Sequence, residues 1–312
     1  MVEFPPLPRE KVKIGPAGWH YSDWAGIVYP SRRPRGFHEL GYLAEFFDTV
    51  EINTTFYQPP KPQIVKVWLH RVAHNPYFRF TAKLWQRFTH QCYANRADET
   101  AFKEGLEPLM QAGKLGALLL QFPWSFRNTK QNREYLGGLV MQFMEYPLVV
   151  EVRHGSWNQP DVYRMLENLE VGFCNIDQPQ IGSSLPPTER NTTGLGYVRL
   201  HGRNYEKWIK PGEFPEQRYN YLYSLPELHP WEEKIRHIAD QTQITYVIAN
   251  NHFRGKSITN ALQLVSLLRG RRVPAPEGLL QWYPELEGMI RIEPGGIFQQ
   301  TELPFEPFHS AA

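Results

Sequence analysis

Short apolar runs with the composition of β-strands recur along the chain at intervals of about 30 to 40 residues. Most of these runs are apolar throughout, which is typical of strands that are covered on both faces. We expect eight strands, at Val12–Gly18, Thr49–Phe56, Arg79–Leu84, Gly116–Phe122, Leu148–His154, Val171–Asp177, Gly196–Gly202 and Thr245–Asn251.

Most of the gaps between these runs contain apolar residues at helical spacing. The helices expected there are Gln63–Arg71, Thr100–Ala112, Gln131–Met144, Pro160–Leu169, Pro230–Asp240 and Ile258–Arg269. This alternation is typical of a parallel sheet, and eight strands favour a closed barrel. An open doubly wound sheet would need a Gly-rich phosphate turn, which GPAGWHYSDW lacks. The pattern therefore predicts an α/β fold, a single (β/α)₈ TIM-like barrel.

The chain has 312 residues, a length that suits one such barrel with long loops. We expect an N-terminal tail at residues 1–11, the barrel at 12–270, and an irregular extension rich in Pro and Gly at 271–312, packed on the barrel. Two connections, Gln178–Thr193 and Arg203–Tyr223, are long enough to be binding loops or lids.

Composition narrows the class of protein. Hydrophobic residues make up 41% and charged residues 21%, which favours a globular chain over a disordered one. The net charge of +2 is dispersed, so we do not expect nucleic acid as a partner. No run approaches the roughly 18 apolar residues of a membrane span, and MVEFPPLPREK does not resemble a signal peptide. We expect a cytoplasmic protein with two free thiols, Cys92 and Cys174, and leave its oligomeric state open.

Charged and amide residues lie near the C-terminal ends of several predicted strands. Strand residues alternate between faces, so each pair two apart in sequence shares a face. The residues selected in this way are Glu51, Asn53, Lys83, Glu151, Arg153, Arg199, His201 and Asn251. Their neighbours of opposite parity are largely apolar, so we expect this set to face the barrel interior at the mouth where such folds have their active sites.

Two interpretations of this set stay open. The charges form either a self-satisfied ion network that fills the barrel or a ligand site, since a buried ion needs a partner or solvent. Rings such as Trp19 and Tyr57 either line a pocket wall or pack in the core.

At these residues the sequence resembles the YecE-like family, the proteins with domain of unknown function 72. The resemblance rests on GPAGWHYSDWAGIVYP, FDTVEINTTFYQPP, FRFTAKLWQRFTH, LGALLLQFPWSF, VEVRHGSW, YVRLHGR and YVIANNHFRGKSITNA. These stretches cover residues 15–261 in the family's order. They depart at GPAG, where the family more often reads GTSG. The resemblance implies a barrel of uncharacterised function whose recurring charged positions fall on Glu51, Lys83, Glu151, Arg153, Arg199 and His201.

The fixed cations in the set outnumber its carboxylates, which favours a small anionic substrate that bears phosphate or carboxylate. We assign general base roles to Glu51 or Glu151, and the role of acid or proton shuttle to His201. Lys83 would be an electrophile or a Schiff-base nucleophile, and Arg153 and Arg199 would hold the anion. Asn53, Asn251, Trp19 and Tyr57 complete the expected binding surface. We predict neither a metal nor a cofactor.

Three alternatives remain. The two carboxylates and the aromatic rim would suit glycoside hydrolysis. Glu51, Glu151, Asp177 and His201 could hold a divalent metal for hydrolysis or isomerisation, although no close-spaced ligand motif is present. A binding protein without catalysis could hold RNA through Arg203, Lys207, Lys210 and Arg218.

The segment Arg203–Tyr223 follows the strand that bears Arg199 and His201, so we expect a mobile cover over the site. Its hinges would be Gly202 and Gly212, and its closing surface Tyr205, Trp208 and Phe214. A rigid decoration of the rim is the alternative.

Overall fold

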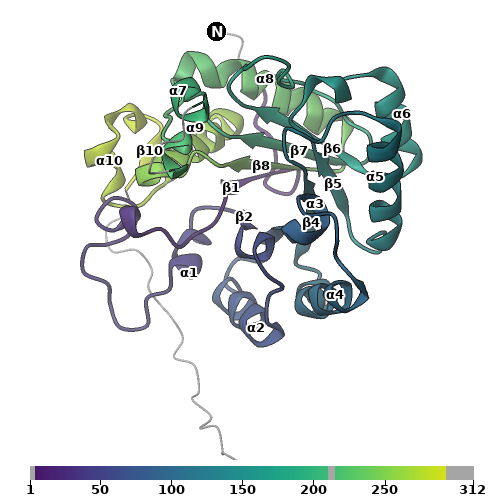
Figure 1. The fold of residues 1–312 in the computed structure, drawn as a ribbon. Coiled ribbons are helices and arrows are strands. Elements are labelled where there is room, and N and C mark those ends of the chain that lie inside the picture. The colour runs from purple at the N-terminus through teal and green to yellow at the C-terminus, as the bar shows by residue number, and fades with distance from the viewer. Residues whose placement is uncertain (1–3, 210–214, 293–312) are drawn as a thin grey trace, which may run out of the picture.

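A computed structural model describes residues 4–209 and 215–292 of the chain (Figure 1). Eight strands form the centre of the molecule: β1 (Val12–Pro16), β2 (Thr49–Ile52), β3 (Arg79–Lys83), β4 (Leu115–Gln121), β5 (Leu148–Glu151), β6 (Gly172–Asp177), β7 (Leu195–Leu200) and β8 (Ile244–Ala249). All hydrogen-bonded neighbours among them are parallel, in the order β1-β8-β7-β6-β5-β4-β3-β2. The predicted strands are confirmed, and each ends at or before its predicted last residue.

The sheet closes on itself between β1 and β2. Ala17 forms a parallel bridge with Glu51, and the Gly18 amide donates to the Glu51 carbonyl at 2.8 Å. Gly15 allows this close approach, because a Cβ there would lie 1.8 Å from the Thr49 carbonyl oxygen. The prediction of an α/β TIM-like barrel is therefore confirmed.

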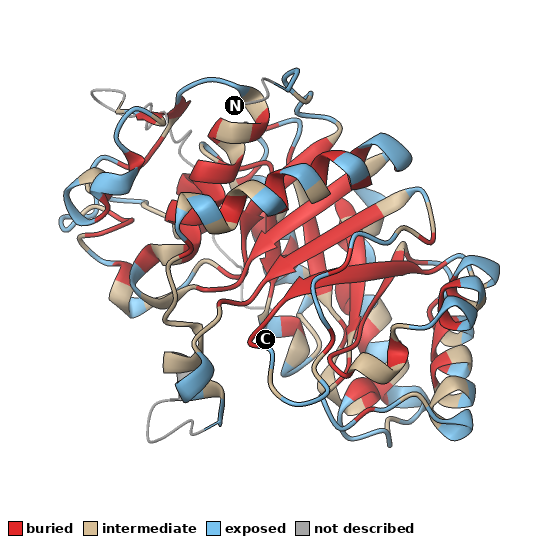
Figure 2. Cartoon of the chain, turned by 90° about the horizontal axis from the view of Figure 1, so that it is seen from above, coloured by how far each residue is buried: buried red, intermediate tan, exposed pale blue. Residues whose placement is uncertain are grey.

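Helices surround the strands (Figure 1). They are α1 (Glu39–Leu43), α2 (Pro62–Arg71), α3 (Gln86–Thr89), α4 (Arg96–Gln111), α5 (Lys130–Gln142), α6 (Pro160–Asn168), α7 (Tyr205–Ile209), α8 (Leu225–Gln241), α9 (Lys256–Arg269) and α10 (Leu279–Trp282), with the short 3₁₀ turns η1 (Ser22–Trp24), η2 (Thr54–Phe56), η3 (Gly155–Trp157), η4 (Pro215–Tyr219), η5 (Phe253–Gly255) and η6 (Pro284–Leu286). Figure 2 shows buried residues on the strands and on the inner faces of the helices, with exposed residues on the outer faces. This is the amphipathic arrangement that helical spacing of apolar residues predicts.

Helix α8 begins five residues before the predicted start at Pro230. Ser224 and Glu227 form a capping box, in which the Ser224 amide donates to the Glu227 carboxylate at 2.9 Å. The sequence Ser-x-x-Glu is the signal for this start, and it outweighs the tendency of proline to open a helix. Pro230 instead lies inside the helix.

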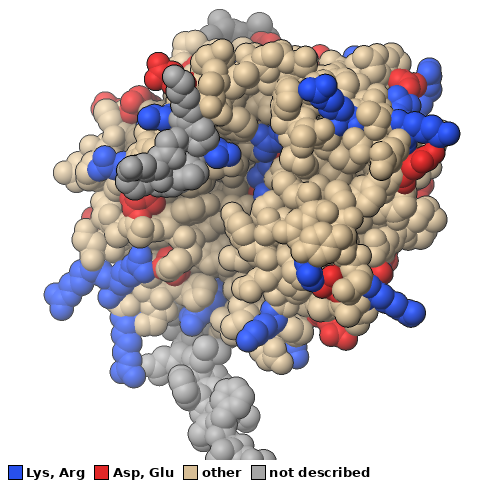
Figure 3. All heavy atoms as spheres, viewed as in Figure 1, with Lys and Arg blue, Asp and Glu red and all other residues tan. Residues whose placement is uncertain are grey.

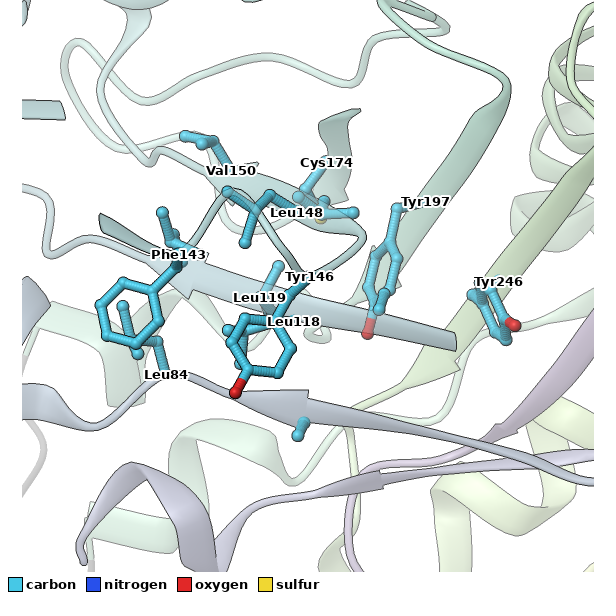
Figure 4. Close-up of a cluster of buried hydrophobic side chains, with 14 of the residues drawn as sticks. Leu84, Leu118, Leu119, Phe143, Tyr146, Leu148, Val150, Cys174, Tyr197 and Tyr246 are labelled. Carbon is cyan, nitrogen blue, oxygen red and sulfur yellow. The ribbon is translucent and has the colours of Figure 1, made fainter. Parts of the chain in front are cut away.

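The buried core fills both the barrel and the space beneath the helices. Figure 4 shows side chains from β3–β8 and from the α5–β5 connection gathered in one cluster, among them Leu118, Phe143 and Tyr197. Gly116 makes room for a ring inside the barrel, because a Cβ there would meet the Tyr246 hydroxyl at 2.0 Å. Burying one such large apolar side chain contributes about 1.5–3 kcal/mol to the free energy of folding.

The chain after α9 continues along the barrel as far as the structure describes it. Strands β9 (Val273–Pro274) and β10 (Ile290–Arg291) pair in parallel, and Leu279 and Leu286 are buried. The Tyr283 hydroxyl donates to the Arg254 carbonyl at 2.5 Å. Within the described residues, every helix is too short or too polar to cross a membrane.

Candidate functional site

Arg199 of β7 lies at the centre of a buried ion network inside the barrel. Its side chain is 1% exposed, and its two terminal nitrogens contact different carboxylates. One nitrogen lies 2.6 Å from Glu51 Oε1, and the other lies 2.5 Å from Glu151 Oε2. Glu51 and Glu151, on β2 and β5, are therefore bridged by one guanidinium, as a buried charge requires.

Each carboxylate has further partners. Glu151 Oε1 lies 2.6 Å from a terminal nitrogen of Arg153 and 3.2 Å from His201 Nε2. The Tyr197 hydroxyl lies 3.0 Å from Glu51 Oε2 and 2.9 Å from Thr81 Oγ1. Strand parity thus brings Glu51, Glu151, Arg153, Arg199 and His201 into one cluster.

Burial and the charges in this cluster determine the protonation states of Glu151 and His201. Burial raises the pKa of Glu151, but the positive charges of Arg153 and Arg199 outweigh burial and hold that pKa well below its ordinary value. Burial, followed by the charge of Arg153, lowers the pKa of His201 to about 3. His201 is therefore a neutral imidazole at pH 7. The Asn250 amide nitrogen lies 3.0 Å from Nδ1, so Nδ1 accepts and the ring proton belongs on Nε2, toward Glu151.

Lys83 at the end of β3 differs from the other cations of the site. Its amine lies 4.0 Å from the centre of the Phe56 ring, and among the described residues it has neither a hydrogen bond nor an ion pair. The side chain is half-buried. Burial, followed by the positive charge of Arg199, lowers the pKa of Lys83 to about 7. A large fraction of this amine is therefore neutral at physiological pH.

His90 is a site residue that the strand pattern did not select. Its ring lies 4.9 Å from the Phe56 ring, on which the Lys83 amine also rests. Reduced hydration, followed by the charges of Lys83 and Arg153, lowers the pKa of His90 to about 4. His90 is an exposed, neutral imidazole beside the amine.

Aromatic rings form one wall of the mouth. The Arg153 guanidinium lies 5.6 Å from the centre of the Trp208 ring, and the His201 ring lies 6.5 Å from it. From Trp208 the wall continues through Tyr219 and His252, with ring-centre distances of 6.4 and 5.0 Å. The segment predicted as a cover thus places Trp208 over the network. That this segment closes on a bound anion stays a prediction, and Gly212 and Phe214 lie outside the described residues.

The remaining predicted binding residues contact groups outside the network. Asn53 donates to the Tyr21 hydroxyl at 3.5 Å, and Trp19 packs edge-on against Trp68 at 5.3 Å. Tyr57 is 66% exposed at the rim. Asn251 is fully buried, and its amide donates to the carbonyl of Tyr221 and the side chain of Asn260.

Asp177 is not part of the network, although the metal alternative included it. Its carboxylate binds Arg203 at 2.6 and 2.9 Å and the Trp231 ring nitrogen at 2.5 Å. Within residues 4–209 and 215–292, no group of three His, Cys, Asp or Glu side chains has the geometry to hold a metal ion. The Arg203 side chain, assigned to RNA in another alternative, is engaged by Asp177 and Glu227. Lys210 lies outside the described residues.

The face seen in Figure 3 is hollowed near its middle, over the region of β7 and β8, and Lys or Arg atoms form part of the floor. A groove of about 1080 Å³ lies elsewhere, with Tyr42, Arg71 and Tyr77 among its lining residues. None of the predicted site residues lines that groove.

Three residues of the site were missed by sequence reasoning. Tyr197 has the same strand parity as Arg199, so alternation was sufficient to find it. Asn250 contacts His201 in place of the predicted Asn251, because the strand ends at Ala249 and its alternation ends there too. His90 follows a helical turn after β3, where no periodic signal applies.

The family model, the related sequences and the solved structures all indicate the same family. The family model described as protein of unknown function DUF72 matches residues 13–280. The chain is 30% identical over 272 residues to the UPF0759 protein YunF of Bacillus subtilis, covering 82% of this chain and 94% of YunF. It is 31% identical over 187 residues to the UPF0759 protein YecE of Escherichia coli, covering 57% and 63%. The crystal structure of a DUF72 family protein of Thermotoga maritima superposes with a TM-score of 0.72 at 33% identity, covering 82% of this chain and 98% of that one.

Proposed function

Because this chain belongs to the DUF72 family, which is described as a family of unknown function, we propose a function from the barrel mouth itself. The protein is an enzyme that binds a small molecule bearing phosphate or carboxylate and transforms it by acid–base chemistry. The mouth of a parallel barrel is the place where such folds carry their active sites.

The balance of charge at the mouth carries this proposal. Glu51 and Glu151 are already compensated by Arg199, and Arg153 adds a second guanidinium to Glu151. Lys83 has no carboxylate partner among the described residues, and the Arg153 Nε is likewise without a hydrogen-bond partner there. When Lys83 is protonated, the site carries one more cation than its two acids neutralise, and a bound anion supplies the missing charge and favours that protonated form.

We assign a chemical role to each group according to its exposure to solvent. Glu51 and Arg199 are fully enclosed, so we assign them the role of a fixed electrostatic frame around the reacting groups. Arg153, which lies against Trp208, binds the anionic group of the substrate. The half-buried Lys83 and the exposed, neutral His90 exchange protons with the substrate, while the neutral His201 holds Glu151 in place.

Thermal unfolding with inorganic phosphate tests this function. Phosphate should raise the melting temperature of the wild type with its concentration, because a ligand that binds the folded state stabilises it. Arg153→Met and Lys83→Met should each reduce this rise, whereas Lys130→Met, at a fully exposed position, should keep it. The absence of any rise in the wild type, or a rise with manganese or zinc alone, contradicts the proposal.

Glycoside hydrolysis finds less support. Sugar cleavage needs a carboxylic acid that donates a proton, with a raised pKa. Glu151 has a lowered pKa, and Glu51 and Glu151 share the Arg199 guanidinium. The two acids are therefore poorly suited to that role.

A further inference from the structure

We propose that Lys83 forms an imine with the carbonyl carbon of its substrate, so the substrate class is an aldehyde or ketone that also bears a carboxylate or phosphate. This inference rests on the proposed function, because the anionic group is what brings the carbonyl compound into the mouth. It adds a covalent role for one residue and a second functional group on the ligand.

The contacts of Lys83 suit a nucleophile. The amine sits at the C-terminal end of β3, on the face of the Phe56 ring, at 4.0 Å from its centre. The carboxylates that would otherwise hold it as an ammonium are engaged by other groups: Glu51 by Arg199 and Tyr197, and Glu151 by Arg153, Arg199 and His201. An amine with an apolar ring beneath it and no carboxylate partner readily exists in the neutral form that attacks carbonyl carbon.

The charges near the amine act in both directions: Glu51 and Glu151 favour the ammonium form, and the two arginines oppose it. Arg199 and Arg153 both disfavour a further positive charge there, and burial contributes the largest effect on the pKa of Lys83, which falls to about 7. The neutral fraction of an ordinary lysine at pH 7 is on the order of 1 in 1000. Lys83 is thus a far better nucleophile at this pH than a lysine on the surface.

The reaction balances without an added oxidant or reductant. The lone pair of Nζ attacks the carbonyl carbon, and the C–O double bond opens to give a carbinolamine. The oxygen then takes one proton from the nitrogen and one from solvent and leaves as water, which produces a protonated imine. This iminium draws electrons from the adjacent carbon, so a proton can be removed there. His90 is a neutral imidazole that packs against the same Phe56 ring and can accept that proton.

Arg153 accounts for the second group of the substrate. It lies close enough to Lys83 to affect the charge of the amine, and it lines the mouth beside Trp208. A carboxylate or phosphate on Arg153 and a carbonyl at Lys83 can therefore belong to one small molecule.

Reductive trapping tests the imine with the full-length protein. The wild type is incubated with pyruvate, reduced with borohydride and digested, and peptide mass spectrometry locates the reduced adduct. Labelling at Lys83 should exceed that at the exposed Lys130 by at least about tenfold at pH 7. It should also rise with pH through a midpoint near 7, which a structural lysine would not show. Lys83→Arg places a permanent positive charge there in place of the nucleophilic amine, and should lose the adduct while retaining the wild-type fold by circular dichroism.

Acetone, a neutral ketone of similar size, separates the inference from the proposed function. Preferential labelling by pyruvate, reduced in Arg153→Met, supports both. Equal labelling of Lys83 by acetone and pyruvate supports the imine and contradicts the anionic substrate. Labelling of Lys83 no greater than that of Lys130, in a protein that phosphate still stabilises, overturns the imine and leaves the proposed function standing.

Discussion

The guanidinium of Arg199 pairs with two carboxylates inside this barrel, so the loss of any one of the three groups leaves a buried charge with fewer partners. Arg199 is held by Glu51 on one side and by Glu151 on the other. Removing one partner of a buried ion pair leaves an uncompensated charge that has no access to water. The loss of stability caused by replacing one of these residues therefore depends on which of its partners remain charged.

Glu51→Gln should lower the free energy of unfolding by about 3–5 kcal/mol, because Arg199 would keep its charge and lose a carboxylate. The amide oxygen of the glutamine could still accept from Arg199, but it would carry no charge to compensate the guanidinium. Urea denaturation at pH 7 measures this difference. Glu134→Gln, in the exposed pair with Lys130, should change stability by less than about 0.5 kcal/mol. A loss below about 1 kcal/mol at Glu51 would contradict a buried network.

The stability of the protein should fall in acid partly through His201. Its pKa is about 3 in the folded protein, against about 6.5 in an unfolded chain. Between these values the unfolded state binds a proton that the folded state does not, so stability decreases as the pH falls through this window. His201→Gln should reduce that slope by up to about 1.4 kcal/mol per pH unit. Urea melts between pH 6.5 and 4 measure it, with His20→Gln, at an exposed position, as the control. Equal slopes for His201→Gln and the wild type would be inconsistent with a buried neutral imidazole.

At the scale of elements, strand alternation predicted the site correctly inside the strands and just past the ends of β5 and β7, but it failed past the end of β8. Within β7 it places Arg199 on the network, and His201 immediately after the strand keeps that side. After β8 the backbone turns toward a helical conformation at His252, so Asn251 points to Asn260 and the adjacent amide takes the contact with His201. Alternation requires extended backbone, and the sequence carries no comparable rule for loops.

Strands β1 and β2 lie too close together at Gly15 to accommodate a side chain there. A Cβ at this position would lie 1.8 Å from the Thr49 carbonyl oxygen, so the strands would have to separate. Gly15→Ala should therefore lower the free energy of unfolding by at least about 3 kcal/mol. Gly138→Ala, in α5 with open space around it, should instead raise stability by about 0.5–1 kcal/mol. Differential scanning calorimetry of the two variants compares them, and a tolerated Gly15→Ala would mean that the strands are not this close.

For the whole molecule, the fold was predictable because eight apolar runs and the helices between them repeat one local pattern. The membership of the charged cluster followed from the same pattern. The ion pairs within the cluster did not follow from this pattern, because contacts such as that of Arg199 with Glu51 join residues 148 positions apart, across the barrel. Which carboxylate each cation holds, and that Lys83 holds none among the described residues, depends on side-chain geometry that closure of the barrel creates.

The ion network joins residues from both halves of the barrel. Strands β1–β4 contribute Glu51, whereas β5–β8 and their ends contribute Glu151, Arg153, Arg199 and His201. A fragment containing the first half alone would carry Glu51 without its guanidinium, and the second half would carry two guanidinium groups on one acid. Each half-barrel thus exposes a charge that the other complements. The network favours reassembly of the two halves over the misassociation of either half with a copy of itself.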